Sequence, residues 1–407
     1  MHNDVYLMSN EASWGFILWS FYFLGGNTMN KFSIKTKIYF GEGSLSRLSE
    51  LNYKKVMVIT DPFMVKSGTI KKITEELEKG SVEYIVFDEI VPDPPIETVV
   101  VGVNKMMEFK PEAIVALGGG SAIDAAKAIK EFALKITKTD DVYFIAIPTT
   151  SGTGSEVTSF SVITDKEKNI KYPLVSDSLL PNEAILDPEL VKTVPNFITA
   201  DTGMDVLTHS LEAYVSTKAN DFTDALAEKS IKLVSDYLLS AYKDGNNTEA
   251  REKMHSASCL AGMAFNEASL GLNHGIAHGI GGKLHIAHGR TNSILLPHIV
   301  EYNADLTGYT NCEYSNAAIR YANIAKILGL PCSNVRTGVK SLINWIVKLQ
   351  KEMNMPRTLK ECGKDINEIN NSIDAIAESA LVDGCTITNP RVPNKNEIIK
   401  ILNIISN

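Results

Sequence analysis

The sequence predicts a parallel α/β domain followed by an all-helical domain. Short β-rich runs alternate with helical stretches from residue 29 to about residue 190, and from about Ile198 onward nearly every segment has helical periodicity. Strands that alternate with helices of about ten or more residues are typical of a parallel sheet covered on both faces. We place the boundary within Leu186–Ile198, which gives an α/β domain at 29–190 and a helical domain at 191–407.

The individual elements follow from the spacing of apolar residues. The strands expected in the first domain are Lys31–Phe40, Val56–Thr60, Val82–Phe87, Ala113–Leu117 and Val142–Ile147, with helices near Lys66–Glu78, Ile96–Glu108 and Ser121–Phe132 and then a hairpin of Thr158–Thr164 and Asn169–Val175. The helices expected in the second are Asp201–Val215, Phe222–Tyr242, Glu249–Phe265, a segment starting near Leu270, Ser315–Leu328, Val335–Met353, Ile366–Leu381 and Glu397–Ile405. The first domain therefore has the strand–helix order of a Rossmann-like fold.

The composition narrows the class of protein. The 407 residues are 44% hydrophobic and 22% charged, which is ordinary for a globular chain. The net charge is −8, whereas a nucleic-acid-binding protein usually presents a basic face. The five cysteines are odd in number and form no CxxC pair, which argues against a disulfide framework or a thiolate zinc site. We expect a cytoplasmic protein with no nucleic-acid or membrane partner.

The first 28 residues differ from the rest. Trp14 to Leu24 is strongly apolar, but it is shorter than the stretch of about 20 residues that spans a bilayer. It is also a poor signal peptide, because acidic residues precede it and no small-residue cleavage site follows. We interpret residues 1–28 as a disordered tail or a start-codon or cloning artefact. The alternative is a segment that docks on a partner or a membrane surface.

A glycine cluster follows one of the expected strands. Gly118-Gly119-Gly120-Ser121 joins the strand Ala113–Leu117 to a helix, so exposed N–H groups and the helix dipole face one point. Ser121 could cap that helix. The cluster is suited to a pyrophosphate, although a tight turn without a ligand is the alternative and the GxGxxG fingerprint is absent.

A second cluster and an acidic residue strengthen the case for a dinucleotide. Thr149, Thr150 and Thr153 lie in a hydroxyl- and glycine-rich loop after the strand that ends at Ile147. Ligands of open α/β sheets bind beyond the carboxyl ends of strands, and both clusters lie at such ends. Asp61 does too, where it can bind ribose hydroxyls and repel a 2′-phosphate, which favours NAD over NADP. The alternative role for Asp61 is a turn residue.

Acidic and histidine side chains in the second half indicate a metal. Asp205 and His209 are spaced i,i+4 in a helical run, which places both on one face. His274 and His278 repeat that spacing, and His285 and His288 follow a glycine-rich stretch. Several histidines in apolar sequence are expected to be buried, and buried polar side chains need partners. A metal ion is one partner that several histidines can share. One carboxylate with three imidazoles suits iron, zinc or cobalt as a Lewis acid for an alcohol oxygen.

Four segments together resemble the iron-dependent (group III) alcohol dehydrogenases. They are GGGSAIDAAKAI, PTTSGTGSEVT, TADTGMDVLTHSLEAY and LGLNHGIAHGIGGKLHIAHGRTNSILLPH, and the resemblance covers Met29–Asn407. DFTDALAEK, IKYPL and GMAFNEASLGLNH are most similar to the propanol dehydrogenases of propanediol-utilisation microcompartments. The resemblance implies a dehydroquinate synthase-like fold, a homodimer, and interconversion of a short-chain primary alcohol and its aldehyde with NAD. It also raises association with a bacterial microcompartment.

The resemblance assigns roles that spacing alone leaves open. It implies iron(II) on Asp205, His209, His274 and His288, with zinc as the other candidate, and His278 beside the metal as a proton-relay residue. It implies dinucleotide contacts from Asp61, Gly119, Gly120, Ser121, Thr149, Thr150 and Thr153, a substrate pocket lined by Phe265 and Cys385, and structural roles for His285 and His298. Asp93 and Gly279 depart from the usual Asn and Pro, which predicts a lost cofactor contact and a looser pocket backbone.

Other functions stay open at this point. An NADPH-dependent butanol or diol dehydrogenase shares the same motifs. A glycerol-type enzyme or a sugar-phosphate lyase shares the fold, but the latter calls for a basic cluster, and none lies near the histidines in sequence. A non-catalytic assembly protein is the most distant alternative, and the intact set of metal-binding side chains argues against it.

Overall fold

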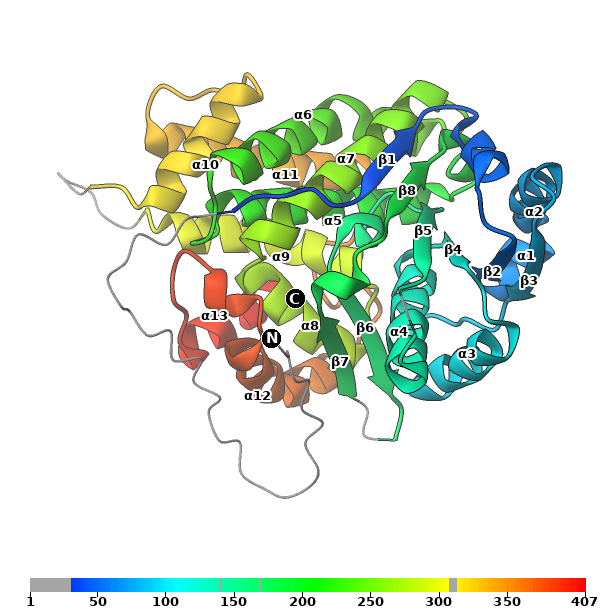
Figure 1. Ribbon diagram of the computed structural model, residues 1–407. Helices are drawn as coiled ribbons and strands as arrows, with labels where there is room; N and C mark the ends of the chain where they lie inside the picture. The colour runs from blue at the N-terminus through cyan, green and yellow to red at the C-terminus, as the bar shows by residue number, and fades with distance from the viewer. Residues whose placement is uncertain (1–30, 140, 168–169, 307–312) are drawn as a thin grey trace. The chain divides into compact units, whose positions relative to one another are not determined.

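The computed structural model describes residues 31–139, 141–167, 170–306 and 313–407. The predicted character of residues 1–28 lies outside this range. Ile34–Asn407 form one compact unit, in which an α/β half and a helical half are packed together (Figure 1). The last strand ends at Leu186 and the first long helix of the second half begins at Asn196. The division into domains at 29–190 and 191–407 stays a prediction.

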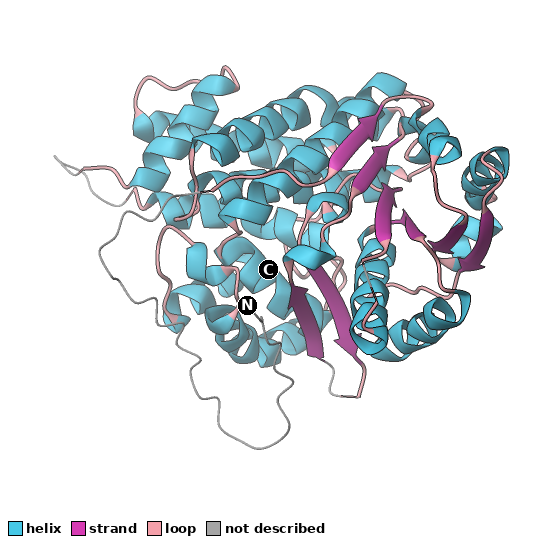
Figure 2. Ribbon diagram, viewed as in Figure 1, coloured by secondary structure: helices cyan, strands magenta, loops and turns pink. Residues whose placement is uncertain are grey.

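The α/β half is built on one six-stranded sheet in which every strand pairing is parallel (Figure 2). The strands are β1 (Lys37–Phe40), β2 (Lys55–Ile59), β3 (Glu83–Phe87), β4 (Ala113–Gly118), β5 (Tyr143–Pro148) and β8 (Glu183–Leu186), in the order β1-β8-β5-β4-β2-β3. The chain runs outward from β2 to β3 and then crosses to β4 on the other side of β2. This reversal is the place where open α/β sheets bind ligands.

Alternate side chains of each strand face different helices. Met57 and Ile59 pack with the helices α3 (Ile96–Phe109) and α4 (Gly120–Thr137), whereas Val56 and Val58 pack on the other face. That second face is covered by η1 (Ser44–Glu50), α1 (Pro62–Lys66) and α2 (Thr69–Lys79). Strands that are buried on both faces read as continuous apolar runs, which is why the sequence predicted them.

Two details of this half differ from the prediction. The helix expected at Lys66–Glu78 is interrupted, because Gly68 adopts a φ of 78° between α1 and α2. The strand β8 was not predicted. The predicted hairpin is present as the antiparallel pair β6 (Phe160–Asp165) and β7 (Ile170–Val175).

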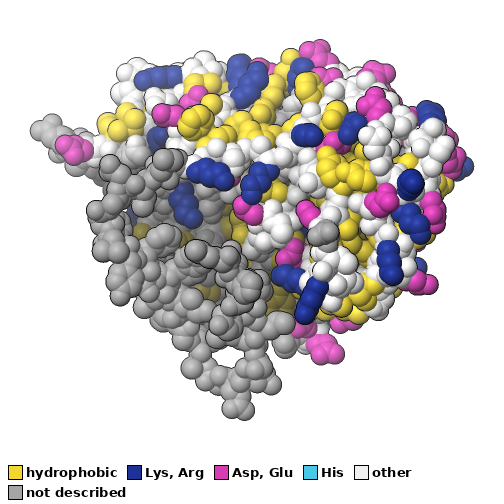
Figure 3. All heavy atoms as spheres, in the orientation of Figure 1, with side chains coloured by type: hydrophobic (Ala, Val, Ile, Leu, Met, Phe, Trp, Pro, Cys, Tyr) yellow, Lys and Arg dark blue, Asp and Glu magenta, His cyan; other side chains and the backbone are white. Residues whose placement is uncertain are grey.

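The second half is helical, as predicted. Its helices are α5 (Asn196–Val215), α6 (Asp221–Lys243), α7 (Thr248–Ala268), α8 (Leu272–Leu284), α9 (His288–Ala304), α10 (Asn316–Ile327), α11 (Val335–Glu352), α12 (Ile366–Val382) and α13 (Lys395–Ser406). The prediction lacked α9, which contains Pro297. Among the described residues no helix is long and apolar enough to cross a membrane. Charges of both signs are interspersed on the face drawn in Figure 3.

Candidate metal centre and nucleotide-binding loops

Three neighbouring strands deliver the predicted nucleotide-binding residues to one edge of the sheet. Asp61 follows β2, and the glycine cluster, Gly118–Ser121, follows β4. The loop that carries Thr149, Thr150 and Thr153, called the threonine loop below, follows β5. The last pair of the β4–β5 ladder joins Gly118 to Pro148, and the N–H of Thr149 donates to the carbonyl of Gly118 over 3.0 Å. The two loops therefore leave the sheet side by side, where backbone donors can converge on one ligand.

Glycine is required where these two loops touch. A Cβ added to Gly120 would lie 2.8 Å from Cγ2 of Thr153, and one added to Gly119 would lie 3.4 Å from Oγ1 of Thr150. Ser121 is not the helix cap that the sequence suggested. The cap is Gly119, so α4 begins one residue earlier, at Gly120, and Ser121 lies in its first turn. The close approach of the Thr153 side chain therefore explains the glycine at position 120, whereas the contact at Gly119 is an ordinary van der Waals distance.

Asp61 is a turn residue that caps a helix with one carboxylate oxygen, and its other oxygen takes no part in the cap. Its Oδ1 caps α1 by accepting from the N–H of Phe63 at 2.8 Å and of Met64 at 3.1 Å. Its Oδ2 lies 3.3 Å from the position that a Cβ on Gly118 would take. The second oxygen thus faces the glycine cluster.

A buried polar cluster that sequence reasoning missed ties α4 to the segment that joins the threonine loop to β6. Nζ of Lys127 donates to the carbonyls of Thr158 and Phe160, at 2.8 and 2.7 Å, and Oγ of Ser155 donates to Asp124 at 2.5 Å. Burial lowers the pKa of Lys127 to about 8. Asp124 and Lys127 stand three residues apart among the alanines of α4, and charged residues within such an apolar stretch were the available signal.

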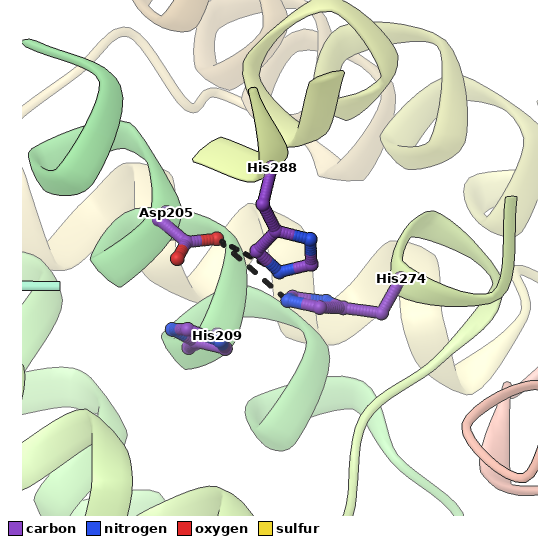
Figure 4. A group of neighbouring side chains, drawn as sticks. All are labelled: Asp205, His209, His274 and His288. Carbon is purple, nitrogen blue, oxygen red and sulfur yellow. Dashed lines mark ion pairs between the residues drawn. The ribbon is translucent and has the colours of Figure 1, made fainter. Parts of the chain in front are cut away.

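The predicted metal-binding residues come together from three helices (Figure 4). Asp205 and His209 project from α5, His274 from α8, and His288 is the first residue of α9. One ligand atom from each lies within 4.8 Å of those of the other three. Oδ1 of Asp205 is 3.7 Å from Nε2 of both His274 and His288. Local sequence patterns do not bring α8 and α9 to α5, so the tertiary fold assembles this group.

The imidazoles of this group are suited to bind a cation. Burial lowers the pKa of His209, and it lowers the pKa of His274 well below the ordinary 6.5. Both rings are therefore neutral near pH 7 and keep a lone pair for a ligand bond. They stack with centroids 4.6 Å apart, and Phe265, predicted to line the pocket, stacks on His209 at the same distance.

Asn292 shows that the acceptors converge. Its Nδ2 lies 2.7 Å from Oδ1 of Asp205, 3.0 Å from Nε2 of His274 and 3.1 Å from Nε2 of His288. An amide nitrogen carries only two hydrogens, so three acceptors exceed what it can satisfy. A divalent ion satisfies several such acceptors at once, and the carboxylate with three neutral imidazoles fits the donor set expected for iron or zinc.

Glu212 lies behind the group and was missed by sequence reasoning. Its Oε2 pairs with Nδ1 of His274 at 2.5 Å, and its Oε1 accepts from the N–H of Asn273 at 2.7 Å. This pairing directs Nε2 of His274 toward Asp205. The signal was present, because Glu212 follows Asp205 by seven residues and His209 by three and therefore shares their helix face.

His278 lies beside the group without belonging to it. Its ring stacks on His288 with centroids 5.5 Å apart, and its Nδ1 pairs with Oδ2 of Asp383 at 2.9 Å. The side chain is 42% exposed, so it borders the open side of the group. Cys385, predicted to line the pocket, lies next to Asp383 and His278. His285 caps the end of α8 and is not part of the group.

The threonine loop packs directly against α5 and α7 of the helical half. A Cβ on Gly152 would lie 2.8 Å from Cβ of Thr202, which precedes Asp205 by three residues on α5. A Cβ on Gly154 would lie 2.7 Å from Cα of Gly262 on α7. The threonine loop and the helix that carries Asp205 and His209 are therefore adjacent.

Both departures from the family pattern have a physical setting. Asp93 adopts a φ of 51° and forms an ion pair with Lys171, and Asn and Asp are the non-glycine residues that most readily adopt such a conformation. Gly279 lies inside α8, where a Cβ would come within 3.1 Å of Ile376 on α12. Gly279 thus allows α8 and α12 to pack closely, and the looser backbone stays a prediction.

Comparison with known proteins identifies the class. The family described as iron-containing alcohol dehydrogenase matches residues 35–188, and the Fe-containing alcohol dehydrogenase family, C-terminal, matches residues 199–405. The chain belongs to the iron-containing alcohol dehydrogenases, and it is an oxidoreductase. The fold predicted from this resemblance is confirmed.

Individual relatives cover nearly the whole chain. A 1-propanol dehydrogenase of Citrobacter freundii is 45% identical over 381 residues, which span 92% of this chain and 99% of the relative. An NADPH-dependent butanol dehydrogenase of Clostridium saccharobutylicum is 43% identical over 93% of this chain and 98% of its own. Among solved structures, a 1,3-propanediol oxidoreductase superposes with a TM-score of 0.85 at 33% identity, covering 93% of this chain and 100% of that one.

Proposed function

We propose that the protein transfers hydride between NAD(H) and a short-chain primary alcohol or aldehyde of about the size of propanol. The observation that carries the proposal is the convergence of Asp205, His209, His274 and His288 beside the threonine loop. We propose iron(II) as the ion, with zinc as the second candidate, since the ligand set accepts both. The similarity to a 1-propanol dehydrogenase supports the size of the substrate.

The chain's own residues prepare the reaction. A bound divalent ion supplies Lewis acidity toward the alcohol oxygen, and the nicotinamide carries the hydride. Glu212 fixes the ring of His274 through Nδ1. Asp383 holds Nδ1 of His278, so Nε2 of His278 is the atom that can take the proton released by the alcohol. Phe265 packs on His209 and lines one side of the site.

A substrate panel tests the function. We expect the iron-loaded protein to oxidise 1-propanol with NAD at least about tenfold more efficiently, in kcat/KM, than ethanol, 1,2-propanediol or glycerol. One methylene in an apolar pocket contributes about 10–200-fold against ethanol, and an apolar pocket rejects an added hydroxyl by up to about 100-fold. The same panel run with NADP tests the second candidate, which the similarity to an NADPH-dependent butanol dehydrogenase favours. Preference for 1-butanol with NADP would select that candidate instead.

We propose that Asp61 sets the preference for NAD. Because its Oδ1 caps α1, a glycine at this position removes both the cap and the charge, whereas Asn keeps the cap and removes only the charge. We expect Asp61→Asn to raise the NADP/NAD ratio of kcat/KM about tenfold or more, as loss of one charge contact of about 1.4 kcal/mol implies. Steady-state kinetics with both cofactors measures the ratio.

Asp365 provides the matched control for this variant. It caps α12 in the same way, through bonds to the N–H groups of Asn367 and Glu368. Asp365→Asn should leave the cofactor ratio at the wild-type value. An unchanged ratio in Asp61→Asn, with normal folding by circular dichroism, would refute the role of Asp61.

We also propose that the protein is a cytoplasmic homodimer that associates with a bacterial microcompartment, and that residues 1–28 form a separate extension from the domains 29–190 and 191–407. The similarity to a 1-propanol dehydrogenase supports the microcompartment. Light scattering of the purified chain and fractionation of cells that form microcompartments test these points. Mass spectrometry of the native N-terminus decides whether residues 1–28 are present.

A further inference from the structure

A second group of potential ligands lies next to the first. Nδ1 of His278, a carboxylate oxygen of Asp383 and Sγ of Cys385 lie within 4.8 Å of one another. His278 belongs to α8, Asp383 follows the end of α12, and Cys385 precedes the short helix η5 (Thr386–Thr388). All three are at least partly exposed, so an ion in solution can reach them.

The chemistry of this second group differs from that of the first. A thiolate, an imidazole and a carboxylate form a mixed S, N and O set, which suits zinc and is unsuited to magnesium or calcium. Zinc bonds of about 2.0–2.3 Å in a tetrahedron place ligand atoms about 3.3–3.8 Å apart. Nδ1 of His278 is 2.9 Å from Oδ2 of Asp383 and the ligand atoms of the group lie within 4.8 Å of one another, so side-chain movements of about 1 Å bring them to that spacing.

Local hydrogen bonds hold the loop that carries two of the ligands. Oδ1 of Asp383 accepts from the N–H of Cys385 at 2.8 Å, which leaves Oδ2 for a ligand bond. Oγ1 of Thr386 donates to the carbonyl of Ala380 at 2.7 Å. A Cβ on Gly275, one turn before His278 on α8, would lie 2.1 Å from that same Oγ1, so the loop rests directly on α8. The three ligands are thus held close together before any ion binds.

We propose that His278, Asp383 and Cys385 form a zinc site distinct from the iron site, with a water molecule as the fourth ligand. Zinc bound there engages His278 through Nδ1 and removes its hydrogen bond to Asp383. His278 is also the proposed proton acceptor, and its ring stacks on His288 with centroids 5.5 Å apart, so an ion that fixes this ring acts beside the first group. Zinc at this second site therefore inhibits the enzyme while iron stays in place. The inhibition rests on the proposed function, whereas the binding does not.

The test uses the full-length protein loaded with iron under anaerobic conditions. Equilibrium dialysis against zinc, followed by elemental analysis, counts both metals in each chain. We expect about one additional zinc per chain with the iron content unchanged, and zinc affinity at least about tenfold weaker in Cys385→Ser and in Asp383→Asn, as loss of one ligand implies. Cys332→Ser, which alters a thiol outside the group, is the control and should bind zinc like the wild type.

Two results would overturn the zinc site. One is a stoichiometric exchange, in which iron leaves as zinc enters. The other is unchanged zinc affinity in Cys385→Ser. If the variants fold poorly, X-ray absorption at the zinc edge of the wild type decides, because the proposed site requires one sulfur at about 2.3 Å and the four ligands of the first group contain none. Normal zinc binding without any alcohol oxidation by the iron form would refute the proposed function alone.

Discussion

His288→Ala is expected to abolish stoichiometric metal binding and to lower kcat more than about 100-fold, while the fold persists. Loss of an outer partner of a metal ligand already costs about 10–100-fold, so loss of a ligand exceeds that range. His288 is the better of the possible variants because its side chain is 42% exposed, whereas His274 is buried and its removal strands Glu212 in the interior. Elemental analysis and steady-state kinetics measure the two effects.

His285→Asn is the control for this experiment. His285 lies three residues before His288, caps the end of α8 with a φ of 51°, and is not part of the metal group. Asn tolerates that backbone conformation, so the substitution changes only the imidazole. It should retain metal and activity. Wild-type metal content in His288→Ala would contradict the assignment of this ligand.

Glu212→Gln is expected to weaken metal affinity about 10–100-fold, which corresponds to about 1.4–2.7 kcal/mol. The carboxylate accepts from two donors on different oxygens, Nδ1 of His274 and the N–H of Asn273. A glutamine has one acceptor oxygen, so its amide group must face one of these donors. If it faces His274, the proton moves to Nε2 and removes the lone pair that the metal needs.

The readout is the rate of metal loss to a chelator, together with the gain in melting temperature when the metal-free protein is reloaded. A ligand that binds only the folded state stabilises it in proportion to the logarithm of its affinity, so a weaker site gives a smaller gain. Glu228→Gln is the control, since Glu228 accepts from the hydroxyl of Tyr214 away from the group. Equal retention of metal in Glu212→Gln and the wild type would show that Glu212 does not position His274.

Most of the fold could be predicted because its signals are local. A buried parallel strand or an amphipathic helix can be recognised from the pattern of apolar residues within a window of about ten residues. The strand β8 could not be found this way. It is four residues long, lies between prolines and carries the fully buried Glu183, whose partner Arg47 lies 136 residues earlier in the chain. Because the partner of Glu183 lies so far away in the sequence, a local pattern of apolar residues does not reveal this strand.

The residues of the candidate site also differ in whether local sequence could predict them. Asp205 and His209 could be paired from spacing because one helix carries both. His274 and His288 could be chosen over His278 only through resemblance, since the choice depends on how α8 and α9 meet α5. Glu212 escaped because a glutamate on a helix is usually exposed, and its partner His274 lies 62 residues later.

On the proposed function, a metal held by Asp205, His209, His274 and His288 is needed for hydride transfer between NAD and a short-chain alcohol. The most direct measurement compares NADH formation from 1-propanol by one preparation in three states: iron-loaded, stripped by a chelator, and stripped then reloaded with iron. We expect activity in the first, a loss of more than about 100-fold in the second, and recovery in the third. Full activity in the stripped protein, with metal absent by elemental analysis, would contradict the claim.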